Sequence, residues 1–116
     1  MEWLRVETRS EYLRVATDEI VYVQADGNYS EIVLTNGKSR IIPCQLHVVQ
    51  GLFETLRSNP FVRLGRSLLV NKRYVFVINL TTQTLIFSGQ QITGDIKNLI
   101  VSRDALKELT EKLQKE

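Results

Sequence analysis

The sequence has few cysteines, histidines and long apolar runs, and these absences exclude several classes of protein. A single cysteine, Cys44, cannot form an internal disulfide, so we expect a reducing, cytoplasmic location. A single histidine, His47, leaves no basis for a metal site or for a Ser-His-Asp or Cys-His catalytic arrangement. There is no glycine-rich phosphate loop, no secretory signal and no run of the roughly 18 apolar residues that a membrane span needs. The sequence therefore predicts no enzyme, no metal, no cofactor and no membrane partner.

Acidic residues are absent from the 40 residues between Thr55 and Gly94, although the net charge of the whole chain is only +2. Residues 32–94 hold seven bases and one acid, whereas residues 1–31 hold seven acids and three bases. A cationic surface without neighbouring anions suits a polyanion such as nucleic acid. A basic stretch is also often only a solvated face, so charge alone leaves both interpretations open.

The length of 116 residues suits one domain, 1–116, with its own core. Alternating apolar and polar residues predict short strands, and Asn36-Gly37 predicts a hairpin turn with positive φ at both central residues. The expected strands are 3–7, 12–15, 20–23, 31–34, 39–42, 62–64, 68–70, 74–80, 84–87 and 99–101.

Two segments show helical spacing instead. Apolar residues from Leu46 to Leu56 predict a helix over residues 44–57. The helix is expected to end before Pro60, because the residue before a proline disfavours the helical conformation. A second helix is expected after Ser102, whose side chain suits an N-cap. Turn signals dominate residues 88–98 and fix no strand register there. The sequence predicts a mainly β fold with one short inserted helix and one C-terminal helix.

Several motifs follow one another in a fixed order. They are Tyr22-Val23-Gln24-Ala25 followed by Gly27-Asn28-Tyr29, the Asn-Gly hairpin, the short helix, Arg66-Ser67 with Val70-Asn71, and Ser102-Arg103. Together they resemble the LytTR family of bacterial DNA-binding domains, usually the output half of response regulators in two-component systems. The resemblance covers roughly residues 3–113. It implies an elongated stack of small antiparallel β-sheets that binds DNA through loops.

The resemblance implies three DNA-binding sites by motif position. They hold Asn28, Tyr29 and Ser30 in the first loop, Arg66 in the second, and Arg103 at the start of the terminal helix. An arginine can bond bidentately to guanine in the major groove, while Asn, Ser and Tyr side chains suit bases, phosphates or sugars. The family often has His where this chain has Gly65, which removes one possible contact.

Two further cations, Arg63 and Lys72, are predicted phosphate contacts on charge alone. Each of these cations could instead be a solvated surface residue. Tyr29 could be partly buried, and Asn71 is expected to be structural, since a polar residue at a strand end often satisfies nearby backbone groups.

The function predicted from these residues is sequence-specific binding of double-stranded DNA by a transcriptional regulator or its output domain. The resemblance implies repeated half-sites on the DNA, and it leaves open a homodimer on DNA and a receiver domain or sensor protein as partners. The alternative is a protein-interaction module that docks an acidic partner through its basic face.

Overall fold

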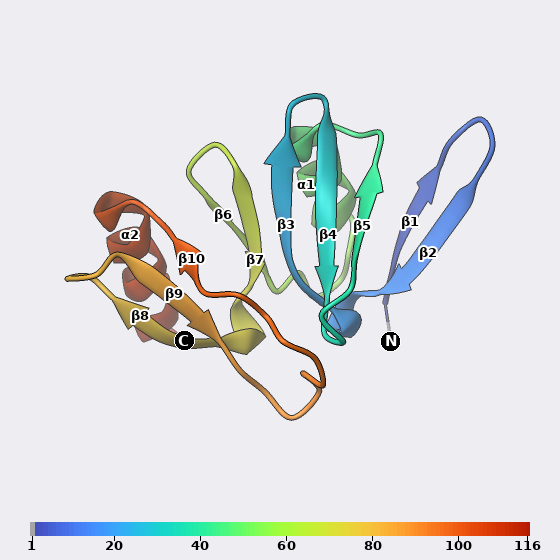
Figure 1. The fold of residues 1–116 in the computed structure, drawn as a ribbon. Coiled ribbons are helices and arrows are strands. Elements are labelled where there is room, and N and C mark those ends of the chain that lie inside the picture. The colour runs from blue at the N-terminus through green and yellow to red at the C-terminus, as the bar shows by residue number, and fades with distance from the viewer. Residues whose placement is uncertain (1) are drawn as a thin grey trace.

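A computed structural model describes residues 2–116, and the fold that these residues form is mainly β (Figure 1). The strands are β1 (Trp3–Glu7), β2 (Tyr12–Ala16), β3 (Ile20–Asp26), β4 (Tyr29–Leu34), β5 (Ser39–Ile42), β6 (Phe61–Leu64), β7 (Leu68–Asn71), β8 (Val75–Asn79), β9 (Thr84–Phe87) and β10 (Leu99–Ile100). The helices are α1 (Leu46–Glu54) and α2 (Arg103–Gln114). Two short 3-10 turns are also present: η1 (Thr17–Glu19) precedes β3, and η2 (Lys72–Tyr74) precedes β8. No helix within residues 2–116 combines the length and apolar character needed to cross a membrane.

The strands form three antiparallel sheets. A central sheet has the strand order β5-β4-β3-β7-β6, β1 pairs with β2, and the third sheet has the order β10-β9-β8. Figure 1 shows the central sheet between the β1–β2 hairpin at one end and the third sheet with α2 at the other. The molecule measures 44 × 29 × 27 Å. The predicted elongated stack of small antiparallel sheets, with one inserted and one C-terminal helix, is confirmed.

The middle of the central sheet is buried on both faces. Successive side chains of a strand point to opposite sides, so one strand contributes to two cores. Leu69 of β7 packs into a core formed with α1 and the β1–β2 hairpin. Its neighbours Leu68 and Val70 pack into a second core formed with the third sheet and α2. Residues Ile20–Val23 of β3 are at most 2% exposed, which agrees with the apolar character of both faces of that segment. Two cores therefore fix the central sheet, and its loops extend beyond them.

The Asn36-Gly37 hairpin forms as predicted between β4 and β5, but its turn is of another type. Only Gly37 has positive φ (84°), and the Leu34 N–H donates to the Lys38 carbonyl at 2.8 Å. The loop therefore has three residues, with glycine in the left-handed position after the first two. The expectation of positive φ at both central residues is wrong, because the extra residue relieves Asn36 of that conformation.

Helix α1 is shorter than predicted at both ends, and it begins at Leu46 instead of residue 44. Helix α1 ends at Glu54, earlier than the predicted residue 57, and the Thr55 hydroxyl donates to the Leu52 carbonyl at 2.7 Å. The Glu2 carboxylate accepts hydrogen bonds from the backbone N–H groups of Arg57 and Ser58, which turns the chain away from the helix. The predicted N-cap of α2 is confirmed, since the Ser102 hydroxyl accepts from the Ala105 N–H at 3.3 Å.

Residues 88–98 form no strand in the described chain. They run out from β9 and back to β10 as an extended arm, visible at the bottom of Figure 1. The N–H groups of Thr93 and Gly94 donate to the Thr35 carbonyl at 2.9 and 3.1 Å. The arm thus docks on the β4–β5 turn through backbone bonds, which leave no alternating side-chain pattern in the sequence.

Candidate nucleic-acid interface

The β3–β4 turn consists of Gly27 and Asn28, between the paired residues Asp26 and Tyr29. Gly27 has φ of +61°, the positive value at the first central residue that a type II′ hairpin turn requires. Asn28 is exposed, and its side-chain oxygen accepts from the Gln45 side chain at 2.9 Å. Tyr29 is 51% exposed, so it belongs to the surface and not to the core. The turn therefore presents an amide and an aromatic ring to solvent.

Ser30 does not share this surface. It is fully buried, and its hydroxyl donates to the Cys44 carbonyl at 2.7 Å. A hydroxyl that satisfies a backbone acceptor inside the fold cannot also reach a duplex. The predicted DNA contact by Ser30 is therefore corrected: this side chain fixes the β5–α1 connection against β4.

The β6–β7 loop consists of residues 65–67, because Leu64 pairs with Leu68. Gly65 has φ of +59°, and the Arg66 side chain is exposed. The Ala25 N–H donates to the Ser67 carbonyl at 2.8 Å, which places this loop directly beside the β3–β4 turn. Figure 1 shows both loops pointing in the same direction, upward in the view. The first two predicted sites thus lie side by side.

Arg63, on β6, points its guanidinium back at this loop. Its Nε donates to the Gly65 carbonyl at 2.9 Å, its Nη2 to the Arg66 carbonyl at 2.8 Å, and its Nη1 to Oε1 of Gln50 at 2.7 Å. All three nitrogens of the fork are engaged within the protein, and the side chain is only partly exposed. This bond network holds the β6–β7 loop, and the phosphate contact by Arg63 stays a prediction.

Arg103 is the first residue of α2 and is exposed. Helix α2 packs against β6, so the helix lies beside the strand that leads into the β6–β7 loop. In Figure 1 the chain enters α2 at the upper left and leaves it near the C-terminus below. We call the β3–β4 turn, the β6–β7 loop and the start of α2 the loop edge of the molecule.

Lys72 lies away from the loop edge. It follows the far end of β7, about 15 Å from the β6–β7 loop at the rise of an extended strand. Its ammonium forms an ion pair with Glu116, beyond the opposite end of α2 from Arg103. Charge alone does not locate Lys72, because strand β7 carries the chain from the β6–β7 loop across the sheet. Lys72 therefore lies outside the loop edge, and its phosphate contact stays a prediction.

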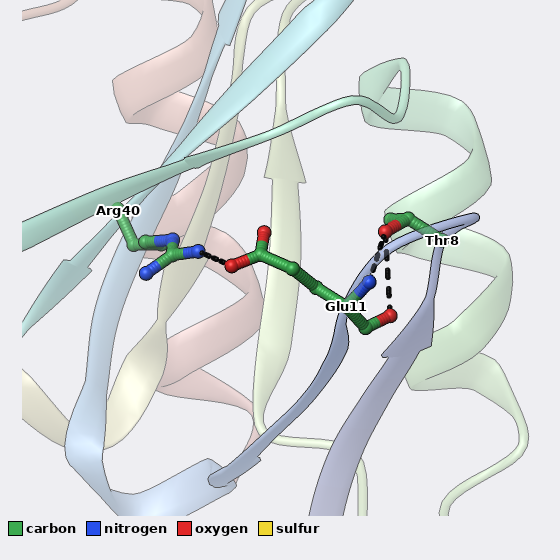
Figure 2. Close-up of polar contacts among 3 residues, drawn as sticks. All are labelled: Thr8, Glu11 and Arg40. Atoms are coloured by element: carbon green, nitrogen blue, oxygen red, sulfur yellow. Dashed lines mark hydrogen bonds and ion pairs between the residues drawn. The ribbon is translucent and has the colours of Figure 1, made fainter.

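Two ion pairs occur among residues 2–116, Lys72–Glu116 and Arg40–Glu11, and neither Arg66 nor Arg103 belongs to them. Figure 2 shows the second pair, in which Arg40 of β5 donates to the Glu11 carboxylate at 2.5 Å. This hydrogen bond and the charge of Glu11 raise the pKa of Arg40. The pair ties the β1–β2 hairpin to the edge of the central sheet. The cations of the loop edge, by contrast, have no acidic side chain bound to them.

The fold and the loop edge define a β-rich domain that presents two exposed cations, Arg66 on a loop and Arg103 at the start of a helix. The family model for the LytTr DNA-binding domain matches residues 10–114. The chain therefore belongs to the LytTR family of DNA-binding domains, which are found in response regulators and are not enzymes.

A solved structure of a LytTr DNA-binding domain from Bacillus cereus, described as part of a methyl-accepting/DNA response regulator, has the same fold. It superposes with a TM-score of 0.66 at 18% identity and covers 97% of both chains. The search of curated proteins gave no match. The family assignment therefore stands on the family model, and the structural likeness supports the fold.

Proposed function

We propose that the chain binds double-stranded DNA sequence-specifically through its loop edge, as a transcriptional regulator or the output domain of one. The observation that supports this most directly is the hydrogen bond between Ala25 and Ser67, which sets the two loops side by side. Asn28, Tyr29 and Arg66 are all exposed on these adjoining loops. A planar guanidinium beside an amide and a phenol provides donors for base edges and for the backbone in one small area.

The roles follow from the residue types. Arg66 is proposed to contact a guanine in the major groove, because its fork matches the O6 and N7 acceptors. Arg103 has the same capacity, and as a cation at the positive end of a helix dipole it gains from an external anion. Asn28 and Tyr29 are proposed to contact phosphates, sugars or a base. Family membership favours this function over docking of an acidic protein partner.

The dimensions of the domain suit a duplex. Its longest axis of 44 Å corresponds to about 13 base pairs at 3.4 Å each. A molecule that lies along the duplex therefore covers more than one helical turn and can place separate loops in successive grooves. Repeated half-sites, each occupied by one copy, are the arrangement we propose for the target, with a receiver domain or sensor as the source of control.

The test compares two arginines with a matched cation outside the loop edge. Arg66→Ala and Arg103→Ala should each weaken binding to the preferred duplex by about 1–3 kcal/mol, measured by fluorescence anisotropy. Lys72→Ala removes the same charge from the far end of β7 and should leave both the affinity and the salt dependence nearly unchanged. Equal weakening by all three variants would mean that only net charge matters, and the proposed interface would be wrong.

A further inference from the structure

The guanidinium of Arg63 holds two of the three carbonyl groups of the loop that presents Arg66. Its three hydrogen bonds run to Gly65 O, Arg66 O and the Gln50 side chain, at 2.9, 2.8 and 2.7 Å. The first two acceptors are successive backbone carbonyls, so the fork fixes the orientation of the peptide units on both sides of the Arg66 Cα. The third acceptor lies on α1 and anchors the fork to a second element.

The loop needs such an anchor. Gly65 has φ of +59° and no atom within 4 Å of the position that a Cβ would occupy, so no packing on that side restrains its backbone. Glycine is also the residue with the greatest backbone freedom. A three-residue loop with an unrestrained glycine would let the Arg66 side chain sample many directions, and a bidentate contact tolerates little misorientation.

Helix α1 holds the neighbouring turn in the same manner. Gln45, just before the helix, donates to the Asn28 side chain at 2.9 Å, and Gln50 within the helix accepts from Arg63. One short helix behind the central sheet therefore connects to both loops through amide side chains. Gln45 and Gln50 therefore fix the positions of the two loops relative to each other.

We infer that Arg63 is a positioning residue for Arg66: it fixes the loop conformation that aims the Arg66 guanidinium and takes no phosphate itself. This inference rests on the proposed function, since it assigns Arg63 a role in base recognition by Arg66. It predicts that Lys cannot replace Arg63, because one ammonium nitrogen on a flexible stem cannot reach three acceptors arranged around a planar fork.

The test uses Arg63→Lys, which keeps the charge and removes the fork. The control duplex differs from the preferred one at a single base pair, the one that the Arg66→Ala variant no longer discriminates. The measured quantity is the ratio of the affinities for the preferred and the control duplex. Arg63→Lys should lower this ratio about fivefold or more, with the salt dependence of binding unchanged. Gln50→Ala should lower it in the same direction by less. In the Arg66→Ala background, Arg63→Lys should change the ratio by less than about twofold, because residues that act through one another are not additive.

Three results would overturn the inference. Arg63→Lys could bind like the parent while Arg63→Ala reduces the salt slope by about one, which is the behaviour of a phosphate contact. The effects of Arg63→Lys and Arg66→Ala could be additive. Alternatively, Arg63→Lys could weaken both duplexes equally and lower the unfolding midpoint, which indicates a purely structural role.

A readout without DNA separates this inference from the proposed function. NMR backbone order parameters at residues 65–67 should be lower in Arg63→Lys than in the parent, and those in β3 should not change. If the parent shows no sequence preference but the loop order parameters fall in this way, the proposed function fails while the loop-holding network stands. If the parent binds specifically and the loop order parameters do not change, the inference fails and the function stands.

Discussion

Replacing Asn71 by alanine tests whether the buried end of β7 is fixed by this one amide. Asn71 has no exposed surface. Its Nδ2 donates to the Ile20 carbonyl at 3.0 Å and approaches the Thr17 carbonyl at 3.5 Å, and its Oδ1 accepts from the Arg73 N–H at 3.1 Å. The amide therefore links the end of β7 to the start of β3 and begins the η2 turn.

The expected loss follows from these bonds. The two bonds near 3.0 Å contribute about 1–1.5 kcal/mol each once their partners are left buried, and the 3.5 Å contact is at the limit of a hydrogen bond and adds little. Asn71→Ala should therefore lower the free energy of unfolding by about 2–3 kcal/mol. Urea unfolding at pH 7 measures this as a shift in midpoint with an unchanged slope.

Asn71→Asp separates the donor from the acceptor. The carboxylate can still accept from the Arg73 N–H, but it faces the Ile20 and Thr17 carbonyls without a proton to donate. It should be at least as destabilising as alanine at pH 7, with a deficit that shrinks in acid as protonation restores a donor. A loss below 1 kcal/mol for Asn71→Ala, or an Asp variant as stable as the parent at pH 7, would refute this account.

Further predictions concern stability away from the loop edge. Hydrogen bonds from the N–H groups of Ser58 and Arg57 lower the pKa of Glu2. These bonds therefore stabilise the folded protein fully at a pH above the ordinary carboxyl pKa, and this stabilisation is lost as the pH falls through the lowered pKa. Glu2→Gln should therefore lower the urea midpoint at pH 7, and its deficit relative to the parent should shrink as the pH falls below the ordinary carboxyl range. Gly51→Ala should raise the free energy of unfolding by about 0.5–1 kcal/mol, because the helical site has open space around a Cβ. Gly94→Ala should lower the free energy of unfolding by about 1–3 kcal/mol, since a Cβ there would lie 1.9 Å from the Asn36 carbonyl oxygen. Equal melting temperatures for the two glycine variants would contradict both expectations.

The order of the elements was predictable from the sequence because each has a local cause. Strand alternation, the Asn-Gly hairpin and the Ser102 cap all depend on a few neighbouring residues, and the structure contains all three. The docked arm over residues 88–98 was not predictable, because its bonds are made by backbone groups to Thr35, far away in sequence. The buried role of Asn71 was predicted from its place at a strand end and is confirmed.

The candidate site was predicted only in part, for a geometric reason. Motif position gives the loops but not which side chains leave them, since Ser30 points into the fold. Charge alone does not show where a cation lies, and Lys72 lies across the sheet from the loops. The network of Arg63 with Gln50 was missed as well. One signal for it exists in the sequence, since Gln50 is polar at a position four residues after Leu46 and three before Phe53, on the face of α1 that is otherwise buried.

The most direct test of the central claim is selection of bound sequences from a randomised duplex library with the purified protein at near-physiological salt. The account predicts recovery of a recurrent motif, in repeated copies, with a guanine whose selection is lost in the Arg66→Ala variant. Recovery of no motif, with weak binding that disappears as salt is added, would contradict it, because the loop edge would then supply charge without base recognition.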